Sequence, residues 1–155
     1  MPLFSRAIFQ LVRWAARKGL RDDHASDEHK LAARRTGIRG ETYAYWYLRR
    51  HGYIFVARNY MPRGIKGELD LVGYDGETLA FVEVRTRTFR DDLPALPELS
   101  VTTDKQRLVA RTAMRFLAEH HVPACPRRFD VLAIDNHAGH PPAVRLHKDA
   151  FSPQL

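Results

Sequence analysis

Between Gly67 and Arg85, apolar and polar side chains alternate along two short runs that are separated by Asp75-Gly76. Such alternation is typical of β-strands, because successive side chains of a strand point to opposite faces of the sheet. Asp-Gly between two such runs favours a two-residue type I′ turn, so the pattern predicts a β-hairpin and its register. The expected cross-strand partners are Tyr74 with Glu77, Asp70 with Phe81, and Glu68 with Glu83.

This register sets Asp70 and Glu83 on one face of the hairpin as diagonal neighbours, roughly 7–8 Å apart at the backbone. Two carboxylates so placed can converge on one divalent cation, and without a cation they repel each other. Arg85 shares their face and is positioned to neutralise part of this charge or to hold a phosphate oxygen. The alternative interpretation is a ladder of ion pairs among Glu68, Glu83 and Arg85 on a solvated face.

Periodicity and turn residues predict the other elements of an α/β fold. Helices are expected over residues 40–51 and from an N-cap at Thr103 to His120, and strands over residues 53–60, 128–135 and 143–147. The 53–60 strand is expected at the edge of the sheet, antiparallel to residues 68–74. Residues 90–99 contain two prolines and are expected to form a loop. Helices before and after a central mixed β-sheet predict a three-layer α/β/α core.

The start of the chain differs from the rest. Apolar residues recur at helical spacing over residues 4–15, and basic residues accompany them with no acidic residue before Asp22. This pattern predicts a basic amphipathic helix that is too short and too charged to span a bilayer. An organelle transit peptide, an anchor on a membrane surface and a helix packed on the domain all stay open as roles. We therefore divide the chain into this helix and a polar linker (residues 1–35), a folded domain (36–151) and a tail (152–155).

Composition narrows the expected partners. The 155-residue chain carries a net charge of +7, which favours polyanionic partners such as nucleic acid, although an anionic membrane surface would also attract it. The single cysteine, Cys125, excludes an internal disulfide and indicates a reducing compartment, the cytoplasm. No Gly-rich phosphate loop, serine nucleophile motif or dinucleotide fingerprint occurs, so no small-molecule cofactor is expected.

Eight segments, in this order, resemble the YraN family of uncharacterised bacterial endonuclease-like proteins. They are Gly40-Glu41, Gly52-Tyr53, Arg58-Asn59-Tyr60, Gly67-Glu68-Leu69-Asp70-Leu71, Phe81-Val82-Glu83-Val84-Arg85-Thr86-Arg87, Lys105-Gln106, Arg128-Phe129-Asp130-Val131 and Lys148-Asp149-Ala150-Phe151. More broadly, an acid in a first helix, an Asp in one strand and a Glu-x-Lys-like triplet in the next are similar to the PD-(D/E)xK nuclease pattern. The resemblance implies a restriction-endonuclease-like fold for residues 36–151.

The resemblance also implies a Mg²⁺-dependent nuclease core, in which Glu41, Asp70 and Glu83 surround the metal (Mg²⁺ or Mn²⁺). Arg85 stands where the broad nuclease pattern has a lysine. An arginine stays charged and acts as a fixed donor, so it excludes general-base chemistry through this position. Lys105 in the following helix is then a candidate to supply the missing ammonium group, or it is simply a solvated lysine near the start of a helix. The backbone carbonyl of Val84 is a candidate further metal ligand.

The leading hypothesis is a metal-dependent nuclease that hydrolyses phosphodiester bonds in DNA rather than RNA, with branched and single-stranded intermediates among the candidate substrates. The alternative is a catalytically silent nucleic-acid-binding module with a nuclease fold. A third hypothesis is a peripheral membrane protein that uses its basic first helix. By analogy with nucleases that cut two strands, a homodimer is plausible.

Two further features of the sequence carry weaker signals. The histidines near Cys125 and around residues 137–140 lack the spacing of a structural zinc site and are interpreted as solvated. Asp130, at the start of a predicted strand, is expected to cap the sheet or to anchor a basic side chain.

Overall fold

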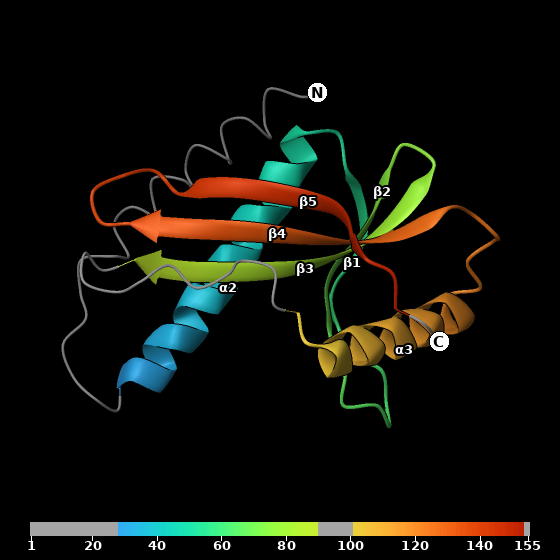
Figure 1. Cartoon of the computed structure of the whole chain (residues 1–155). Coiled ribbons are helices and arrows are strands. Elements are labelled where there is room, and N and C mark those ends of the chain that lie inside the picture. The colour runs from blue at the N-terminus through green and yellow to red at the C-terminus, as the bar shows by residue number, and fades with distance from the viewer. Residues whose placement is uncertain (1–27, 90–100, 154–155) are drawn as a thin grey trace. The chain divides into compact units, whose positions relative to one another are not determined.

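The computed structural model of the chain describes residues 28–89 and 101–153. This part of the chain forms two helices and a five-stranded sheet (Figure 1). The elements are α2 (Glu28–Arg50), β1 (Ile54–Tyr60), β2 (Leu69–Asp75), β3 (Thr78–Phe89), α3 (Thr103–Glu119), β4 (Arg127–His137) and β5 (Ala143–Phe151). The fold is therefore α/β, as predicted, and consistent with a restriction-endonuclease-like core.

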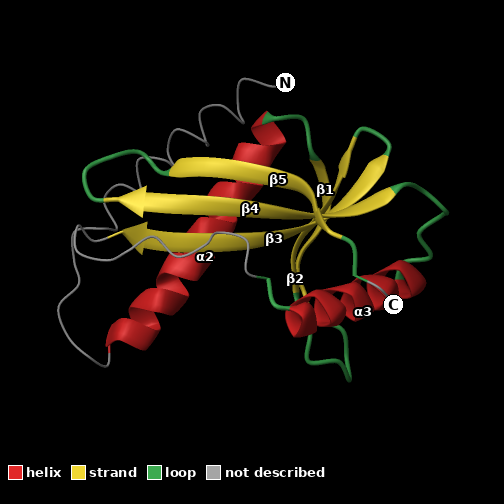
Figure 2. Cartoon of the chain, in the orientation of Figure 1, coloured by secondary structure: helices red, strands yellow, loops and turns green. Residues whose placement is uncertain are grey.

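The strands follow one another across the sheet in chain order, β1-β2-β3-β4-β5, so β1 and β5 are its edges (Figure 2). β1 and β2 pair antiparallel, and so do β2 and β3. The arrows of β3 and β4 point the same way in Figure 1. Parallel neighbours need a crossover connection, and α3 lies in the segment that joins them. The predicted mixed sheet and the predicted edge position of the first strand are both confirmed.

Two predicted boundaries were wrong for local reasons. The first helix was expected to begin at Gly40, but α2 begins at Glu28, so residues 28–30, expected in the polar linker, are helical. Charged residues dominate its first turns and hide them from a search for apolar periodicity. The N-cap of α3 is Thr102 rather than Thr103, because the Thr102 hydroxyl accepts a hydrogen bond from the Lys105 backbone N–H at 3.3 Å. His120 ends α3, as expected.

The chain divides into two compact units. One, which we call the hairpin unit, comprises Tyr53–Glu83, Pro97–Val131 and Leu146–Leu155. The other, the long-helix unit, comprises Met1–Gly52, Val84–Leu96 and Leu132–Arg145. The boundary crosses β3 between Glu83 and Val84.

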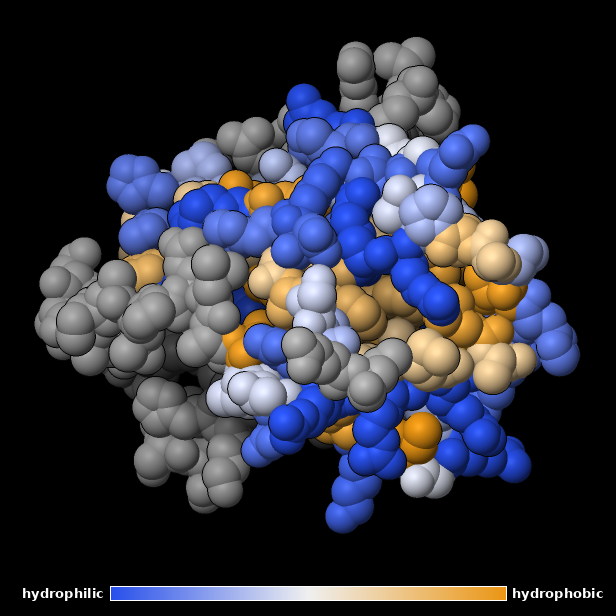
Figure 3. Space-filling model, turned by 45° about the vertical axis from the view of Figure 1, so that its right-hand side comes forward, coloured by the Kyte–Doolittle hydropathy of each residue, from blue (hydrophilic) through white to orange (hydrophobic). Residues whose placement is uncertain are grey.

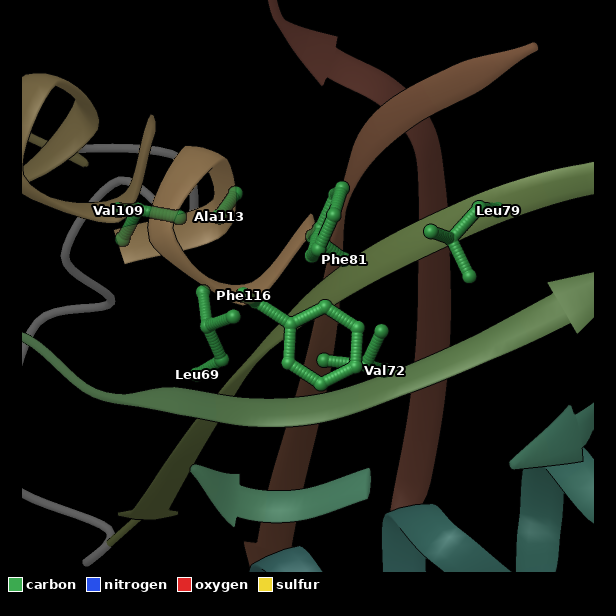
Figure 4. Close-up of a cluster of buried hydrophobic side chains, with 7 residues drawn as sticks. All are labelled: Leu69, Val72, Leu79, Phe81, Val109, Ala113 and Phe116. Atoms are coloured by element: carbon green, nitrogen blue, oxygen red, sulfur yellow. The ribbon is translucent and has the colours of Figure 1, made fainter. Parts of the chain in front are cut away.

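The hydrophobic core of the hairpin unit lies between α3 and the strands β2 and β3. Apolar residues three or four apart in α3 bury one face of this helix, as its sequence predicts. Figure 4 shows the side chains that meet there: Leu69, Val72, Leu79, Phe81, Val109, Ala113 and Phe116. The Phe81 and Phe116 rings meet edge to face with centroids 6.3 Å apart. This packing fixes the start of β3, and with it Glu83.

In the long-helix unit, α2 lies close to the second half of β3. A Cβ atom on Gly40 would lie 1.9 Å from Oγ1 of Thr86, so only glycine permits this approach. Ala44 and Leu48, one and two turns further along α2, are fully buried. The close contact thus places the residue after Gly40, which is Glu41, near the start of the buried face of α2.

Several predictions fall on residues outside the described ranges. They concern the amphipathic helix over residues 4–15, most of the linker over residues 22–30, the loop over residues 90–99 and the end of the tail. Neither of the described helices is long and apolar enough to cross a membrane.

Candidate active site

The pairing of β2 with β3 decides how the two candidate carboxylates lie. Leu71 pairs with Val82 and Val72 with Phe81, and Asp70 and Glu83 lie directly beyond the Leu71–Val82 pair on their two strands. The predicted partners were wrong by two residues. Since a shift of two preserves the face on which each side chain lies, the prediction that Asp70 and Glu83 share a face is correct.

The turn explains the shift. Asp75 pairs with Thr78, so the two loop residues are Gly76 and Glu77 rather than Asp75 and Gly76. Gly76 has φ of 62°, while Glu77 is not among the described residues with positive φ. A positive φ at the first central residue alone matches type II′, which prefers glycine there. Glu68 then lies just before β2, which begins at Leu69, and is not a cross-strand partner of Glu83.

Glu83 is a buried acid with a cation beside it. Its side chain is 7% exposed, and Nζ of Lys105 lies 3.3 Å from its Oε1. A buried carboxylate needs a charged or hydrogen-bonded partner, because burial penalises its ionised form. Lys105 lies in the first turn of α3, and its side chain is one-third exposed. The buried Glu83 carboxylate is therefore paired with a group that solvent reaches. The ammonium group of Lys105 thus lies beside the Glu83 carboxylate, and its role in catalysis stays a prediction.

The donor set of the hairpin unit fits Mg²⁺ in number and kind. Among the described residues, no group of three or more His, Cys, Asp or Glu side chains forms a ready-made metal cage. Mg²⁺ rarely needs such a cage, since it keeps several waters and binds through one or two carboxylates together with substrate phosphates. Asp70 on β2 and Glu83 on β3 are two carboxylates on neighbouring strands, as this requirement asks.

The other predicted site residues belong to the long-helix unit. Glu41 lies on α2, whereas Val84 and Arg85 lie on β3, and all three are partly exposed. Along β3, Arg85 and Arg87 alternate onto the face opposite to Thr86, the residue that meets Gly40 of α2. Nε of Arg87 lies 3.6 Å from Oδ1 of the buried Asp135 on β4. Arginines therefore follow Glu83 along its own strand.

The model of the uncharacterised protein family UPF0102 matches residues 40–134, from the start of the buried face of α2 to the middle of β4. This chain belongs to UPF0102. The match confirms the predicted resemblance to the YraN-like family, and it spans every candidate site residue. Its description assigns no activity to the family.

Curated members of UPF0102 are similar over most of the chain. A UPF0102 protein of Koribacter versatilis is 40% identical over 122 residues, which cover 76% of this chain and 79% of that protein. One from Geobacter metallireducens is 42% identical over 116 residues, covering 74% and 90%. One from Geotalea uraniireducens is 37% identical over 132 residues, covering 85% and 97%.

A second cluster of charged groups in this UPF0102 chain lies wholly within the hairpin unit. Asp130 is fully buried, and Nε of Arg128 donates to its two carboxylate oxygens at 2.9 and 3.0 Å. Nη2 of Arg128 donates to the hydroxyl oxygen of Tyr53 at 2.9 Å and to Oδ2 of Asp75 at 2.6 Å. Nζ of Lys148 reaches the same oxygen of Asp75 at 2.6 Å. These groups satisfy one another, so we assign them a structural role.

The cluster shifts the proton affinity of its members. The hydrogen bond from Lys148, followed by the one from Arg128, holds the pKa of Asp75 below its usual value. Burial and the neighbouring Asp130 carboxylate raise the pKa of Tyr53. Although burial disfavours the charged guanidinium, the hydrogen bonds to Asp130 and Asp75 raise the pKa of Arg128. The prediction that Asp130 anchors a basic side chain is confirmed.

Proposed function

We propose that this UPF0102 protein is a metal-dependent nuclease that hydrolyses phosphodiester bonds in DNA, with branched and single-stranded DNA among its candidate substrates. The observation that carries the proposal is the placement of Asp70 and Glu83 next to the last pair of the β2–β3 ladder, with Nζ of Lys105 3.3 Å from Oε1 of Glu83. Two carboxylates and an ammonium group on neighbouring elements supply both a cation site and a positive charge for a phosphate. The resemblance to PD-(D/E)xK nucleases supports the same assignment.

Asp70 and Glu83 would hold Mg²⁺ or Mn²⁺, with the Val84 carbonyl and Glu41 as the further predicted ligands. When bound, the ion supplies a lowered pKa for its water and polarises the scissile phosphate. Asp70 and Glu83 then serve to fix the position of the cation on a sheet whose register is set by the hairpin.

Lys105 and Arg85 would stabilise the negative charge that develops on the phosphate. Arg85 stays protonated and acts as a rigid donor of hydrogen bonds, so it holds and orients a phosphate oxygen without moving a proton. Nζ of Lys105 lies 3.3 Å from Oε1 of Glu83, so its positive charge stands next to the proposed cation site. The half-buried Cys125 is a free thiol, which supports a reducing compartment such as the cytoplasm.

Cleavage of labelled linear, branched and single-stranded DNA with Mg²⁺ or Mn²⁺ tests the proposal. We expect Asp70→Ala and Glu83→Ala each to abolish cleavage, because each removes one of two cation ligands. Both variants should bind DNA in chelator about as tightly as the unaltered protein. The unfolding midpoint of Asp70→Ala should also stay close to that of the unaltered protein. Glu77→Gln is the matched control, since it removes an exposed acid from the same hairpin turn. Calorimetric titration with Mn²⁺ should show binding that Asp70→Ala loses and Glu77→Gln keeps. Undiminished cleavage by either alanine variant would refute the assigned roles.

One observation favours the alternative, a nucleic-acid-binding module without turnover. Lys105 already gives the buried Glu83 a cationic partner, so the carboxylate is compensated without a metal. On this alternative, the unaltered protein would bind DNA equally well in chelator and in Mg²⁺, take up no Mn²⁺ and cleave none of the substrates. The same titration and cleavage assays therefore separate the two functions.

A further inference from the structure

The solvent face of α3 carries a row of arginines that the candidate active site does not use. Arg107, Arg111 and Arg115 recur every four residues, which places them along one side of the helix about 6 Å apart. All three are exposed, because the opposite side of α3 packs into the core of the hairpin unit. Figure 3 shows hydrophilic side chains projecting along the lower edge of that view, at the level where α3 lies in Figure 1.

This row does not stabilise the helix on which it lies. Like charges four residues apart destabilise a helix by about 0.2–0.5 kcal/mol per pair, and a cation near the N-terminus also opposes the helix dipole. Acidic neighbours compensate only in part: Asp104 lies 3.8 Å from Arg107, and Glu119 lies 2.6 Å from Arg115 while also accepting the hydroxyl of Tyr60. Within the part of the chain that the structure describes, Arg111 has no acidic partner. Because the row does not stabilise α3, we interpret it as a binding surface.

A basic loop lies against the same flank of α3. Gly67 approaches this helix so closely that an added Cβ would be 1.9 Å from Oγ1 of Thr112 and 3.4 Å from Cδ1 of Leu108. The two preceding cations of this loop, Arg63 and Lys66, are exposed. Residues four apart in a helix are rotated by about 40° from each other, so the arginine row winds gradually toward the side of α3 that carries Leu108 and Thr112. The loop therefore adds its positive charge next to the row.

We propose that these five residues form a basic strip that binds the sugar–phosphate backbone of DNA, and we keep this name for Arg63, Lys66, Arg107, Arg111 and Arg115. Guanidinium groups match phosphate oxygens with two parallel hydrogen bonds, and groups one helical turn apart reach different phosphates. The contacts go to the backbone, so the strip binds without preference for sequence. The proposal rests on DNA as the substrate of the proposed function, but it does not require cleavage.

A membrane fits this surface less well than DNA does. Helices that bind bilayers bury an apolar face among the lipid chains, whereas the apolar face of α3 already packs on the sheet. Met114 is the one large hydrophobic side chain of α3 that counts as exposed among the described residues. Charge without an insertable apolar face favours a polyanion in water over a lipid surface.

The test measures binding of a fluorescent DNA duplex by the full-length protein in chelator, across a range of salt concentrations. We compare Arg107→Gln/Arg111→Gln/Arg115→Gln with a control that loses the same charge elsewhere, Arg50→Gln/Arg58→Gln/Arg127→Gln. The strip variant should lose affinity on the order of tenfold or more, and the slope of log affinity against log salt should fall by about three, one for each lost phosphate contact. The control should keep most of its affinity, and circular dichroism should show both variants folded.

Equal losses in the strip variant and the control would overturn the proposal, because they would show that only net charge matters. Retained DNA binding with lost binding to phosphatidylserine vesicles would overturn it in favour of a lipid surface. The measurement uses no metal and no turnover. If DNA binding depends on the strip but the unaltered protein cleaves nothing, the nuclease proposal is refuted and the strip proposal is not. If the unaltered protein cleaves DNA and the strip variant binds DNA as tightly as the unaltered protein does, the strip proposal is refuted and the nuclease proposal is not.

Discussion

Asp130 illustrates what a sequence reveals about a single residue and what it leaves hidden. A charged residue at the start of a strand predicted an anchor for a basic side chain, and Arg128, two positions earlier, fulfils this role. The other members of the cluster, Tyr53, Asp75 and Lys148, come from distant parts of the chain. Their meeting depends on tertiary packing, for which no local pattern gives a signal. The sequence offered Lys105 as a candidate ammonium group, but it did not predict the ion pair of Lys105 with Glu83.

At this scale, the Asp75 carboxylate should make stability depend on pH. Its pKa in the folded protein is lowered, chiefly by the hydrogen bond from Lys148, so its contribution is present above the unfolded value of 3.8 and is lost as the pH falls through the folded value. Lys148→Gln should lower the free energy of unfolding at pH 7 by about 0.2–1 kcal/mol, since Lys148 is half-exposed. It should also weaken the loss of stability below about pH 4. Urea unfolding between pH 7 and pH 2 measures both effects.

Lys66→Gln, which removes an exposed lysine of the loop after β1, serves as the control for this experiment. Its acid dependence should match that of the unaltered protein. An unchanged acid dependence in Lys148→Gln would contradict the role assigned to the ion pair.

Among the elements, the hairpin of β2 and β3 was predicted in kind but not in register. Alternation of apolar and polar residues depends only on which face each residue occupies, so it survives a shift of two residues. The register is set by the turn, and Asp75-Gly76-Glu77 permits two loop positions that place glycine at different points of the turn. The sequence could therefore predict that Asp70 and Glu83 share a face, but not the register of the hairpin that carries them.

The packing of the loop before β2 against α3 leads to a prediction for Gly67. Gly67→Ala should lower the free energy of unfolding by about 1–3 kcal/mol, because the new methyl group overlaps the buried hydroxyl of Thr112. Thr112→Ala removes this hydroxyl, so the double variant should be more stable than the sum of the two single effects implies. Denaturant unfolding of the four proteins measures the coupling. Strict additivity would show that the loop moves aside without cost.

Across the whole molecule, the sequence predicted the α/β class and the edge position of the first strand, since both follow from periodicity and chain connectivity. It did not predict the division into two units. The boundary between the units falls inside individual strands. Where a strand is apolar on both faces, its sequence does not change at the point where its contacts pass from one unit to the other. Hydrophobic patterning is a property of segments, whereas a compact unit is a property of contacts between distant segments.

The strands β3, β4 and β5 each contribute to both units, so we expect the molecule to unfold in a single transition. Phe116→Ala opens the core of the hairpin unit and should cost about 3–5 kcal/mol. In a Trp14→Phe background, fluorescence reports on Trp46 in the long-helix unit. The Trp46 signal and far-ultraviolet circular dichroism should shift together to lower urea concentration. A Trp46 transition that stays in place while the dichroism shifts would show that the units unfold independently.

The irregularity in β1 bears on the tendency of this protein to aggregate at high concentration. The pairing of β1 with β2 slips between Phe55 and Ala57, and Asn59 adopts φ of 49°. Ile54 and Val56 are exposed on this border strand, which by itself would invite another chain to add to the sheet. A kinked strand offers a visiting chain only a few aligned hydrogen-bonding groups, so the slip protects against fibril growth. Straightening this strand by deleting one residue should therefore make the protein more prone to aggregate.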